Sequence, residues 1–321
     1  MIPYRSYLKN RFGSNVLKIP VNAGFSCPNR DGTKSLDGCA FCDNRAFSPV
    51  HASKTSPAGQ VSDAVDKCNG KYKLFLPYLQ PFSNTYAPVD KLKSVYEPLL
   101  SITGVVGLAI GTRPDCFDEP IYEYLGELNK RAYLSVELGL QSGHDSVLAR
   151  MNRGHTVQDF KDAVSRLDRL GIETVAHVIL GLPGETDEMV EETAAMLAAL
   201  PVRGVKAHQL MIIAGTPLEQ MYRSGSARAL TLEEYAALLR KFLARLRPEQ
   251  HIHRIIADST PERGLIAPMW SAEKIKALNY INAKSNNNKN NNMEGTMPIN
   301  LIKPINMEGT RPLRGQPYPT L

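Results

Sequence analysis

The chain has 321 residues, 43% of them hydrophobic, and its 38 Lys and Arg against 32 Asp and Glu give a net charge of +6. This apolar content excludes an intrinsically disordered polymer, and no stretch approaches the roughly 18 consecutive apolar residues of a membrane span. The polar, basic N-terminus has no apolar run like that of a secretory signal. We therefore expect a cytoplasmic protein with no membrane partner.

Short runs rich in apolar and β-branched residues alternate with longer helix-like stretches. The runs predict strands at Val16–Val21, Lys73–Gln80, Val105–Thr112, Ala132–Gln141, Thr174–Leu180 and Val205–Met211. The stretches between them predict helices at Pro57–Cys68, Asp90–Ile102, Glu119–Arg131, Thr156–Leu170 and Glu185–Leu200. Nearly continuous apolar character is typical of strands covered on both faces. The alternation predicts an α/β fold, a partial (β/α)6 TIM-like barrel of parallel strands with a short C-terminal extension.

Local signals indicate where some of these helices begin and end. Asp90 and Asp118 are candidate N-caps, and Gly171 stands where a C-terminal glycine is expected. Thr231 and Glu234 match a capping box that opens a further amphipathic helix, Thr231–Leu246.

Three regions are expected along the chain. Residues 1–230 form the partial barrel. Residues 231–283 form an extension packed on it, with a strand and turn segment and a closing helix after Thr231–Leu246, at His253–Pro268 and Ser271–Ile281. Residues 284–321 are rich in Asn and Pro, contain a near-repeat and lack apolar periodicity. We expect this tail to be disordered.

Three of the five cysteines lie in one polar loop directly after the first strand. Cys27, Cys39 and Cys42 are separated by gaps of eleven and two residues. In a barrel, such loops form the face where active sites are built, and in a reducing compartment their spacing indicates metal binding. One alternative is a zinc site with His51 as the fourth ligand. The other is a [4Fe–4S] cluster held by three cysteines, which leaves one iron open. The isolated thiols receive no role: Cys68 and Cys116.

The cysteine loop resembles that of the radical S-adenosylmethionine (SAM) superfamily. The commonest loop there is C-x3-C-x2-C, from which the eleven-residue first gap departs. The chain is similar instead to a bacterial subfamily with the run C-P-N-R-D-G-T followed by G-C-x-F-C, present here as Cys27–Thr33 and Gly38–Cys42. That subfamily is related to the radical domain of the Elongator catalytic subunit, which works on wobble uridine in tRNA. The resemblance extends from Met1 to about Ala283.

The resemblance implies a [4Fe–4S] cluster on the three cysteines and SAM bound at its open iron. Members of the superfamily cleave SAM reductively, with an electron from a flavodoxin or ferredoxin. The 5′-deoxyadenosyl radical then abstracts a hydrogen atom from the substrate. The resemblance implies tRNA wobble uridine as the substrate, and the net charge of +6 is compatible with RNA. A small-molecule substrate in cofactor biosynthesis is one alternative, and a zinc-stabilised nucleic-acid-binding protein is another.

Further SAM contacts are expected where strands end. Many members bind the methionine amino group with Gly-Gly-Glu, and this chain has Ser83 and Asn84 at that place. Glu137 and Gln141 stand on the fourth strand, where members often place polar residues against the ribose hydroxyls. Glu137 fits a structural ion pair equally well.

Two later segments complete the expected SAM site. Arg153, in the run Asn152–His155, corresponds to an arginine that can pair with the methionine carboxylate, a bidentate and charge-assisted contact. Gly181 and Gly184 belong to the glycine-rich turn after the fifth strand, where the backbone can approach the adenine.

Overall fold

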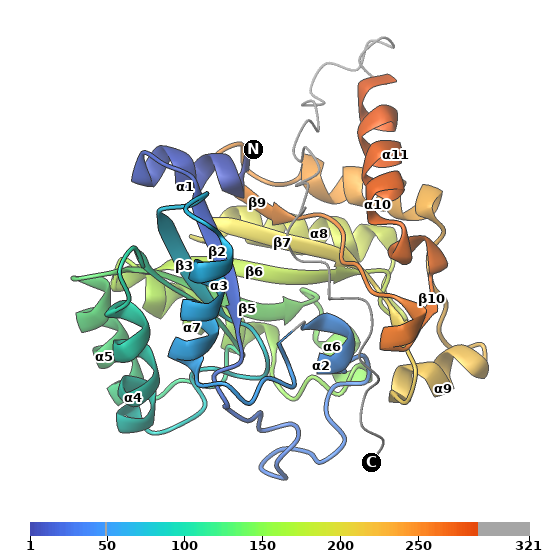
Figure 1. The fold of residues 1–321 in the computed structure, drawn as a ribbon. Coiled ribbons are helices and arrows are strands. Elements are labelled where there is room, and N and C mark those ends of the chain that lie inside the picture. The colour runs from blue at the N-terminus through green and yellow to red at the C-terminus, as the bar shows by residue number, and fades with distance from the viewer. Residues whose placement is uncertain (49, 288–321) are drawn as a thin grey trace.

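The structure is a computed structural model that describes residues 1–48 and 50–287 (Figure 1). Its main sheet has eight strands, all paired in parallel. Their order across the sheet is β1 (Ile2–Pro3), β9 (His251–Arg254), β7 (Gly204–Gln209), β6 (Glu173–Leu180), β5 (Tyr133–Gln141), β4 (Gly107–Thr112), β3 (Leu74–Leu79) and β2 (Val16–Val21). The sheet curls into a half-barrel, which confirms the predicted fold class.

The described α-helices surround the curled sheet, and most of those that connect its strands cover its outside (Figure 1). They are α1 (Tyr4–Phe12), α2 (Asn44–Phe47), α3 (Pro57–Lys67), α4 (Val89–Leu100), α5 (Glu119–Asn129), α6 (Asp145–Arg150), α7 (Val157–Arg169), α8 (Asp187–Ala199), α9 (Pro217–Arg223), α10 (Leu232–Ala244) and α11 (Lys274–Asn287). A two-stranded antiparallel pair, β8 (Ile212–Ile213) with β10 (Leu265–Ala267), lies beside them. None of the described helices combines the length and apolar content that a membrane span requires.

The six predicted strands are present, and two more extend the sheet at one edge. β1 has only two residues, too few for a period-2 pattern to reveal. β9 begins two residues before the predicted segment His253–Pro268. Helix α11 runs to Asn287, and the rest of the predicted tail, from residue 288, lies outside the described residues.

Capping chemistry explains the helix ends. Asp118 caps α5, Thr231 and Glu234 form the capping box of α10, and Gly171 adopts a φ of 69° after α7, all as predicted. The prediction for Asp90 is wrong, because α4 begins at Val89 after Pro88 and Asp90 lies in its first turn. Glu185 does not open α8, because the Thr186 side chain accepts the hydrogen bond of the Met189 N–H and caps the helix there.

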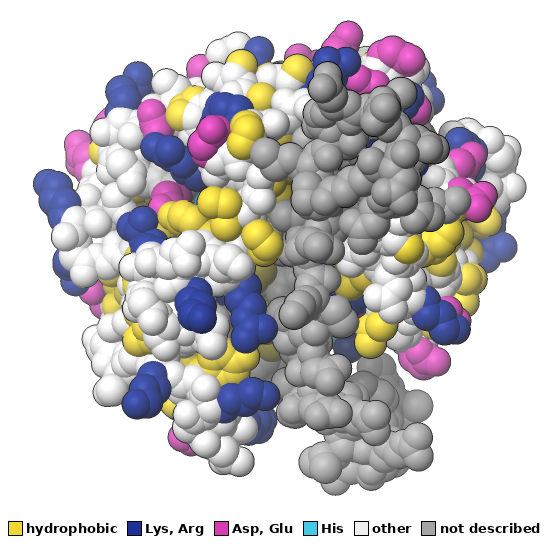
Figure 2. Space-filling view, turned by 90° about the horizontal axis from the view of Figure 1, so that it is seen from above, with side chains coloured by type: hydrophobic (Ala, Val, Ile, Leu, Met, Phe, Trp, Pro, Cys, Tyr) yellow, Lys and Arg dark blue, Asp and Glu magenta, His cyan; other side chains and the backbone are white. Residues whose placement is uncertain are grey.

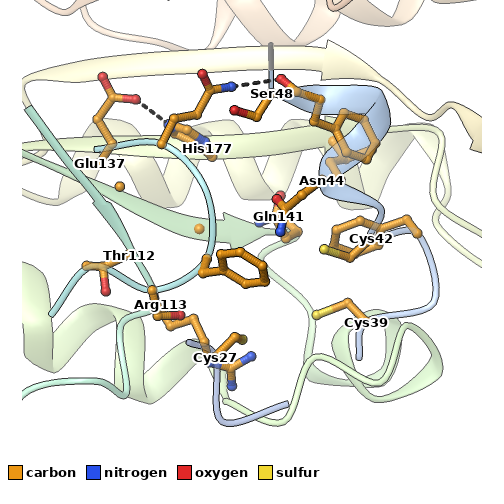
Figure 3. A pocket seen from close by; sticks show the side chains of 18 of the residues that line it. Cys27, Cys39, Cys42, Asn44, Ser48, Thr112, Arg113, Glu137, Gln141 and His177 are labelled. Carbon is orange, nitrogen blue, oxygen red and sulfur yellow. Dashed lines mark hydrogen bonds and ion pairs between the residues drawn. The ribbon is translucent and has the colours of Figure 1, made fainter. Parts of the chain in front are cut away.

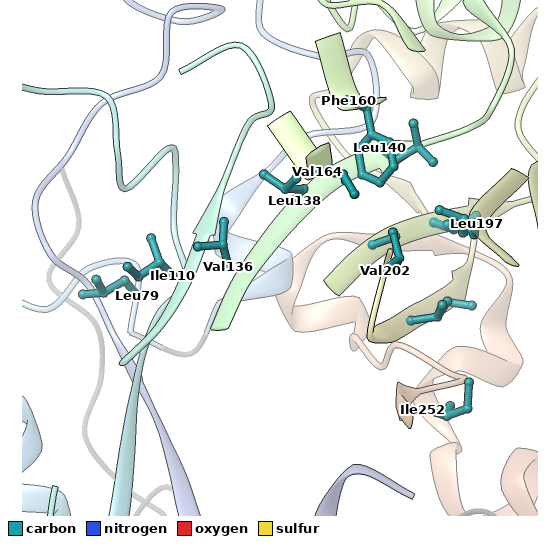
Figure 4. Packing of buried hydrophobic residues seen from close by; sticks show 14 of the residues in the cluster. Leu79, Ile110, Val136, Leu138, Leu140, Phe160, Val164, Leu197, Val202 and Ile252 are labelled. Atoms are coloured by element: carbon teal, nitrogen blue, oxygen red, sulfur yellow. The ribbon is translucent and has the colours of Figure 1, made fainter. Parts of the chain in front are cut away.

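Alternation along the strands separates an apolar outside from a polar inside. Leu138, Ala176, Val205 and Ile252 are paired in succession across β5, β6, β7 and β9, and all are buried in the main hydrophobic cluster. Figure 4 shows Leu138 and Ile252 in this layer, with Phe160 and Val164 of α7 packed against the same side of β5. The next residue along each strand faces the interior, and most of these residues are polar: Gly139, His177, Lys206 and, after a shift in register, Arg254.

Helix α1 closes the interior at the amino-terminal ends of the strands. The ring of Tyr4 stacks on His253 with centroids 3.5 Å apart, and the hydroxyl of Tyr7 donates to Glu173, the first residue of β6. Since the cysteine loop follows β2 at its carboxyl end, the interior remains accessible from the cysteine side.

Candidate active site

A cavity at the carboxyl ends of the strands brings most of the predicted site residues together (Figure 3). The predicted residues that line it are Cys27, Cys39, Cys42, Ser83, Glu137, Gln141 and Arg153. Figure 3 shows the three thiols at one end and Glu137 with His177 at the other. These residues come from the loop after β2, the loop after β3, strand β5 and the segment that follows α6.

Backbone hydrogen bonds shape the cysteine loop. The Cys27 carbonyl accepts from the N–H groups of Arg30 and Asp31 at 2.8 and 3.2 Å, which forms a tight turn. The Cys42 N–H donates to the Cys39 carbonyl at 2.9 Å, a second turn that holds these thiols near one another. The two cysteines separated by two residues therefore share one turn, while the eleven-residue gap forms an excursion of the loop.

Asn29, which the sequence analysis did not single out, links this loop to the segment that carries Arg153. It is fully buried, and its amide nitrogen donates to the carbonyls of Asn152 at 2.6 Å and Arg153 at 3.2 Å. Gly154 permits this approach, since it has a φ of +66° and a Cβ there would lie 2.7 Å from Asn29 Oδ1. The sequence signal that could have pointed to Asn29 was its place two residues after Cys27.

Arg153 lies directly against the cysteine site. Its Nη1 is 3.1 Å from Cys39 Sγ, its Nη2 donates to the Gly139 carbonyl at 2.7 Å, and its buried Nε has no hydrogen-bond partner. A Cβ on Gly139 would lie 2.6 Å from Arg153 Nη2, so glycine at this position makes room for the guanidinium. Arg153 therefore retains a free buried donor beside the thiols.

Arg113 is the second guanidinium at this end of the cavity. It forms a bidentate ion pair with Asp115, with N–O distances of 2.9 and 2.8 Å, and its buried Nη1 has no partner. Lys34 of the cysteine loop also pairs with Asp115. Burial acts to raise the pKa of Asp115, but the hydrogen bonds and charges of Arg113 and Lys34 outweigh it and lower the pKa to about 2.

We expect the free energy of unfolding to fall at low pH in part because Asp115 becomes protonated. Its folded pKa of about 2 lies below the ordinary value of 3.8, so its contribution is fully present above that ordinary value and is lost as the pH falls through 2. Asp115→Asn should reduce the free energy of unfolding by about 2 kcal/mol at pH 7. The difference from the parent protein should shrink between pH 4 and 2 in urea unfolding curves. A constant difference over that range would contradict this role.

Glu137 forms the centre of a buried ionic cluster at the far end of the cavity. Its carboxylate contacts Lys18 and Lys206 Nζ, the latter at 2.9 Å, and His177 Nε2 at 2.7 Å and His253 Nδ1 at 3.4 Å. Burial acts to raise the pKa of Glu137, but the two lysines outweigh it and hold the pKa well below its usual range. The structural ion pair considered for Glu137 is present, and the same side chain lines the cavity.

Gln141 ends β5 in a strained conformation. Its φ is +77°, which is uncommon for a residue with a side chain, and the β5–β6 register shifts between Gly139 and Gln141. The side chain lines the cavity, and its amide lies near Arg153 around the space left by Gly139.

The other predicted residues do not line the cavity. Asn84 is fully buried and donates to the carbonyls of Leu79, Pro81 and Gly111, so it fixes the loop after β3. Gly181 and Gly184 both have positive φ, and a Cβ on Gly181 would meet the side chain of Leu230. These two glycines form a turn required by the backbone.

His51, the fourth ligand in the zinc alternative, lies outside the cavity lining, with its Nδ1 3.0 Å from the Ser48 carbonyl. Within residues 1–48 and 50–287, no three His, Cys, Asp or Glu side chains gather closely enough to hold one metal ion. An iron–sulfur cluster binds each cysteine through a different iron, so it needs thiols around a cavity. Burial, together with Cys39, raises the pKa of Cys42 above the usual range of a thiol, and a bound metal would favour the ionised form.

Comparison with known families agrees with this geometry. Residues 25–197 match the radical SAM superfamily, and residues 202–287 match the radical SAM C-terminal domain. The chain belongs to the radical SAM superfamily. Membership implies a [4Fe–4S] cluster and SAM. The three cysteines would hold the cluster, and Arg153 and Arg113 each have a buried donor without a partner beside them, which would suit SAM.

Similar proteins occur in bacteria and in a fission yeast. The chain is 38% identical over 284 residues to the uncharacterized protein YtqA of Bacillus subtilis, covering 88% of both proteins. It is 34% identical to YhcC of Escherichia coli, covering 82% of this chain and 85% of that protein. Elongator complex protein 3 of Schizosaccharomyces pombe is 30% identical over 162 residues, which cover 49% of this chain but only 29% of that protein.

A solved structure shares the fold. The Elp3 protein of the archaeon Methanocaldococcus infernus superimposes with a TM-score of 0.63 at 18% identity, over 84% of this chain and 63% of that one. This solved structure thus agrees with the partial barrel predicted from the alternation of strands and helices.

The analysis of the sequence missed several side chains at the far end of the radical SAM cavity. Tyr78, Lys206 and Arg254 line it, and Lys18 supports them through Glu137. The available signal was a charged residue inside an otherwise apolar strand, as at Lys18, Glu137 and Lys206. Such residues face the interior of the half-barrel and not the helices.

Proposed function

We propose that this radical SAM enzyme acts in the cytoplasm on tRNA, at a wobble uridine. A cluster held by the three cysteines would supply the one electron for cleavage of SAM into methionine and a 5′-deoxyadenosyl radical, the species that would abstract a hydrogen atom from the substrate. The observation that carries the enzymatic part is the cavity itself, with three thiols and two partly unpaired guanidinium groups at one end. The likeness to Elongator complex protein 3 supports the tRNA part.

The cysteine loop could also contact RNA. Arg30 and Lys34 are exposed on it beside the cavity, although Arg30 donates to the Cys42 carbonyl and Lys34 is paired with Asp115. A phosphate group would add to these contacts at the surface. On the visible part of the face that carries α1 and α11, Lys and Arg side chains form separate groups and no continuous track (Figure 2). The proposal places RNA over the cysteine loop, because that loop lies at the cavity and carries these two exposed basic residues.

The decisive test of the substrate compares modified nucleosides in total tRNA from strains with and without this gene. The proposal expects one modified wobble uridine to disappear and its precursor to accumulate. It also expects purified protein to bind tRNA with an affinity that falls as salt rises. Unchanged tRNA nucleosides would contradict the tRNA substrate.

A small-molecule substrate in cofactor biosynthesis is the second candidate. The observation that favours it is the polar interior behind the cysteines, which α1 closes at the amino-terminal end. A closed interior suits a compact ligand. Changes in cofactor levels with unchanged tRNA in the gene deletion would support this reading.

We expect Arg153 to contribute to SAM binding through its free donor. Arg153→Met should weaken SAM binding by about tenfold or more, since a hydrogen bond to a charged group contributes about 1.5–3 kcal/mol. Iron content should stay unchanged, because the thiols remain. Equilibrium dialysis with SAM on the reconstituted protein measures the effect. Arg223→Met, on the exposed surface of α9, is the matched control, and equal affinity of the two variants would remove Arg153 from the site.

A further inference from the structure

One register row crosses the polar interior behind the cysteines. Gly139 of β5, His177 of β6, Lys206 of β7 and Arg254 of β9 are paired in succession. His177, Lys206 and Arg254 line the same cavity as the three cysteines. The row therefore runs from the space beside Arg153, which Gly139 leaves open, to Arg254 at the edge of the half-barrel.

A β-bulge places Arg254 in this row. Val205 pairs with Ile252, but the next partner of β7, Lys206, pairs with Arg254, so His253 is an extra residue on β9. Without the extra residue, Arg254 would share the face of Ile252, which is buried in the hydrophobic cluster. Bulges redirect side chains in this way and occur next to active sites. Here the bulge brings a guanidinium group to the cavity.

Arg254 differs in its partners from the other cations of the cavity. Each of the others contacts a carboxylate, carbonyl or thiol: Arg30, Arg113, Arg153 and Lys206. In the described part of the chain, the Arg254 guanidinium has no hydrogen bond or ion pair, and its Nε is buried without a partner. Arg254 is partly buried, and a charged group that is partly withdrawn from water without a partner is costly, so it indicates a missing anionic ligand.

The surrounding charge favours an anion as well. Two carboxylates act on Lys18, Lys206 and Arg254: Glu137, which contacts both lysines, and Asp258, which acts on Arg254 from a distance and is itself paired with Lys274. The cations still outnumber the carboxylates. Glu137 is already occupied by two lysines and two histidines, so it is not available to Arg254. Lys206 is the direct register neighbour of Arg254, which places a second cation beside the free guanidinium.

We propose that Arg254 and Lys206 form an anion-binding subsite that holds a phosphate or carboxylate group of the substrate. The proposal rests on the radical SAM function, because the subsite shares the cavity with the cysteines. An anion fixed at Arg254 orients the rest of the substrate toward the cysteine end, where hydrogen abstraction takes place. Guanidinium groups bind both kinds of anion through two parallel N–H bonds, which fixes orientation as well as position.

The test uses inorganic phosphate and acetate as probes on the anaerobically reconstituted protein. Equilibrium dialysis with each radiolabelled anion measures binding directly. Reductive methylation of Lys206 with formaldehyde, quantified by peptide mass spectrometry, reports occupancy of the subsite. Burial lowers the pKa of Lys206 below the usual range of a lysine, so more of its amine is unprotonated at pH 8 than that of an exposed lysine. An anion at Arg254 favours the ammonium form and should protect Lys206.

We expect at least one of the two anions to bind and to protect Lys206. Arg254→Met should weaken that binding by about tenfold or more, and Arg254→Lys should retain part of it. Arg263→Met, at an exposed arginine, should behave like the parent protein. The anion that binds more tightly identifies the substrate group as phosphate or carboxylate.

Two results would overturn the subsite: neither anion binds, or Arg254→Met binds both as well as the parent. Formation of 5′-deoxyadenosine from SAM, measured in the same preparations without substrate, tests the proposed function separately. If the parent protein cleaves SAM but binds neither anion, only the subsite is wrong. If it binds an anion at Arg254 but never cleaves SAM, the proposed function fails and the subsite stands.

Discussion

Replacing any one of Cys27, Cys39 and Cys42 by Ala should abolish cluster assembly and SAM cleavage. All three thiols line one cavity, and a cluster held by three protein ligands has no spare ligand to compensate. We expect 5′-deoxyadenosine formation under dithionite to fall by more than about a hundredfold, beyond the 10–100-fold that loss of an outer contact costs. The parent should hold about four iron atoms per chain with labile sulfide.

Cys68→Ala is the matched control for these variants. Cys68 is partly buried at the end of α3 and does not line the cavity, so its replacement should leave iron content and SAM cleavage unchanged. Metal analysis also decides the zinc alternative. One zinc per chain, lost in His51→Ala, would replace the cluster assignment, and a cysteine variant with full cleavage activity would also contradict it.

Replacing Glu137 by Gln should strongly destabilise the fold. The side chain is 1% exposed and neutralises Lys18 and Lys206 in the interior. Removing one partner of a buried ion pair leaves uncompensated charge, so we expect a loss of about 3–5 kcal/mol in the free energy of unfolding. Urea unfolding at pH 7 measures it. Since the pKa of Glu137 is held well below its ordinary value of 4.5, its contribution is present above that value and is lost in acid.

Glu119→Gln controls for the loss of a carboxylate in general. Glu119 pairs with Arg166 at the surface, with 62% of its side chain exposed, and such pairs contribute about 0–1 kcal/mol. The double variant Glu137→Leu/Lys206→Met removes charge of both signs and should be more stable than Glu137→Gln. A Glu137→Gln variant no less stable than Glu119→Gln would show that the interior is hydrated enough to dispense with the ion pair.

The sequence predicted the strands and the cysteine site because both depend on local patterns. The apolar runs at β2 to β7 and the two cysteine turns are readable over a few residues. Arg153 and Gln141 were reached through the family resemblance, and both line the cavity. Asn84, Gly181 and Gly184 were also reached through the resemblance, but they do not line the cavity. Asn84 holds the loop after β3, and the two glycines have positive φ. Their contacts with SAM stay predictions.

The interior cluster escaped prediction because it depends on register between distant strands. Lys206 and Arg254 become neighbours only through the β7–β9 pairing, and Arg254 only through the extra residue His253. The bulge has no local signature in the run HIHR of β9. Period-2 reasoning places alternate residues on one face, and it fails where one residue is inserted.

The pairing of β1 with β9 joins the N-terminal strand of the chain to a strand about 250 residues later. Ile2 and Pro3 lie beside His251 and Ile252, and β9 itself lies against β7. A fragment ending at residue 230 would leave the backbone amides and carbonyls of β7 without a neighbour and deprive β1 of its only support in the sheet. Open edges of this kind recruit other chains, so such a fragment is expected to precipitate when expressed alone. A protein fused to the N-terminus likewise needs a spacer before Ile2, because Ile2 and Pro3 are already paired with β9 in the sheet.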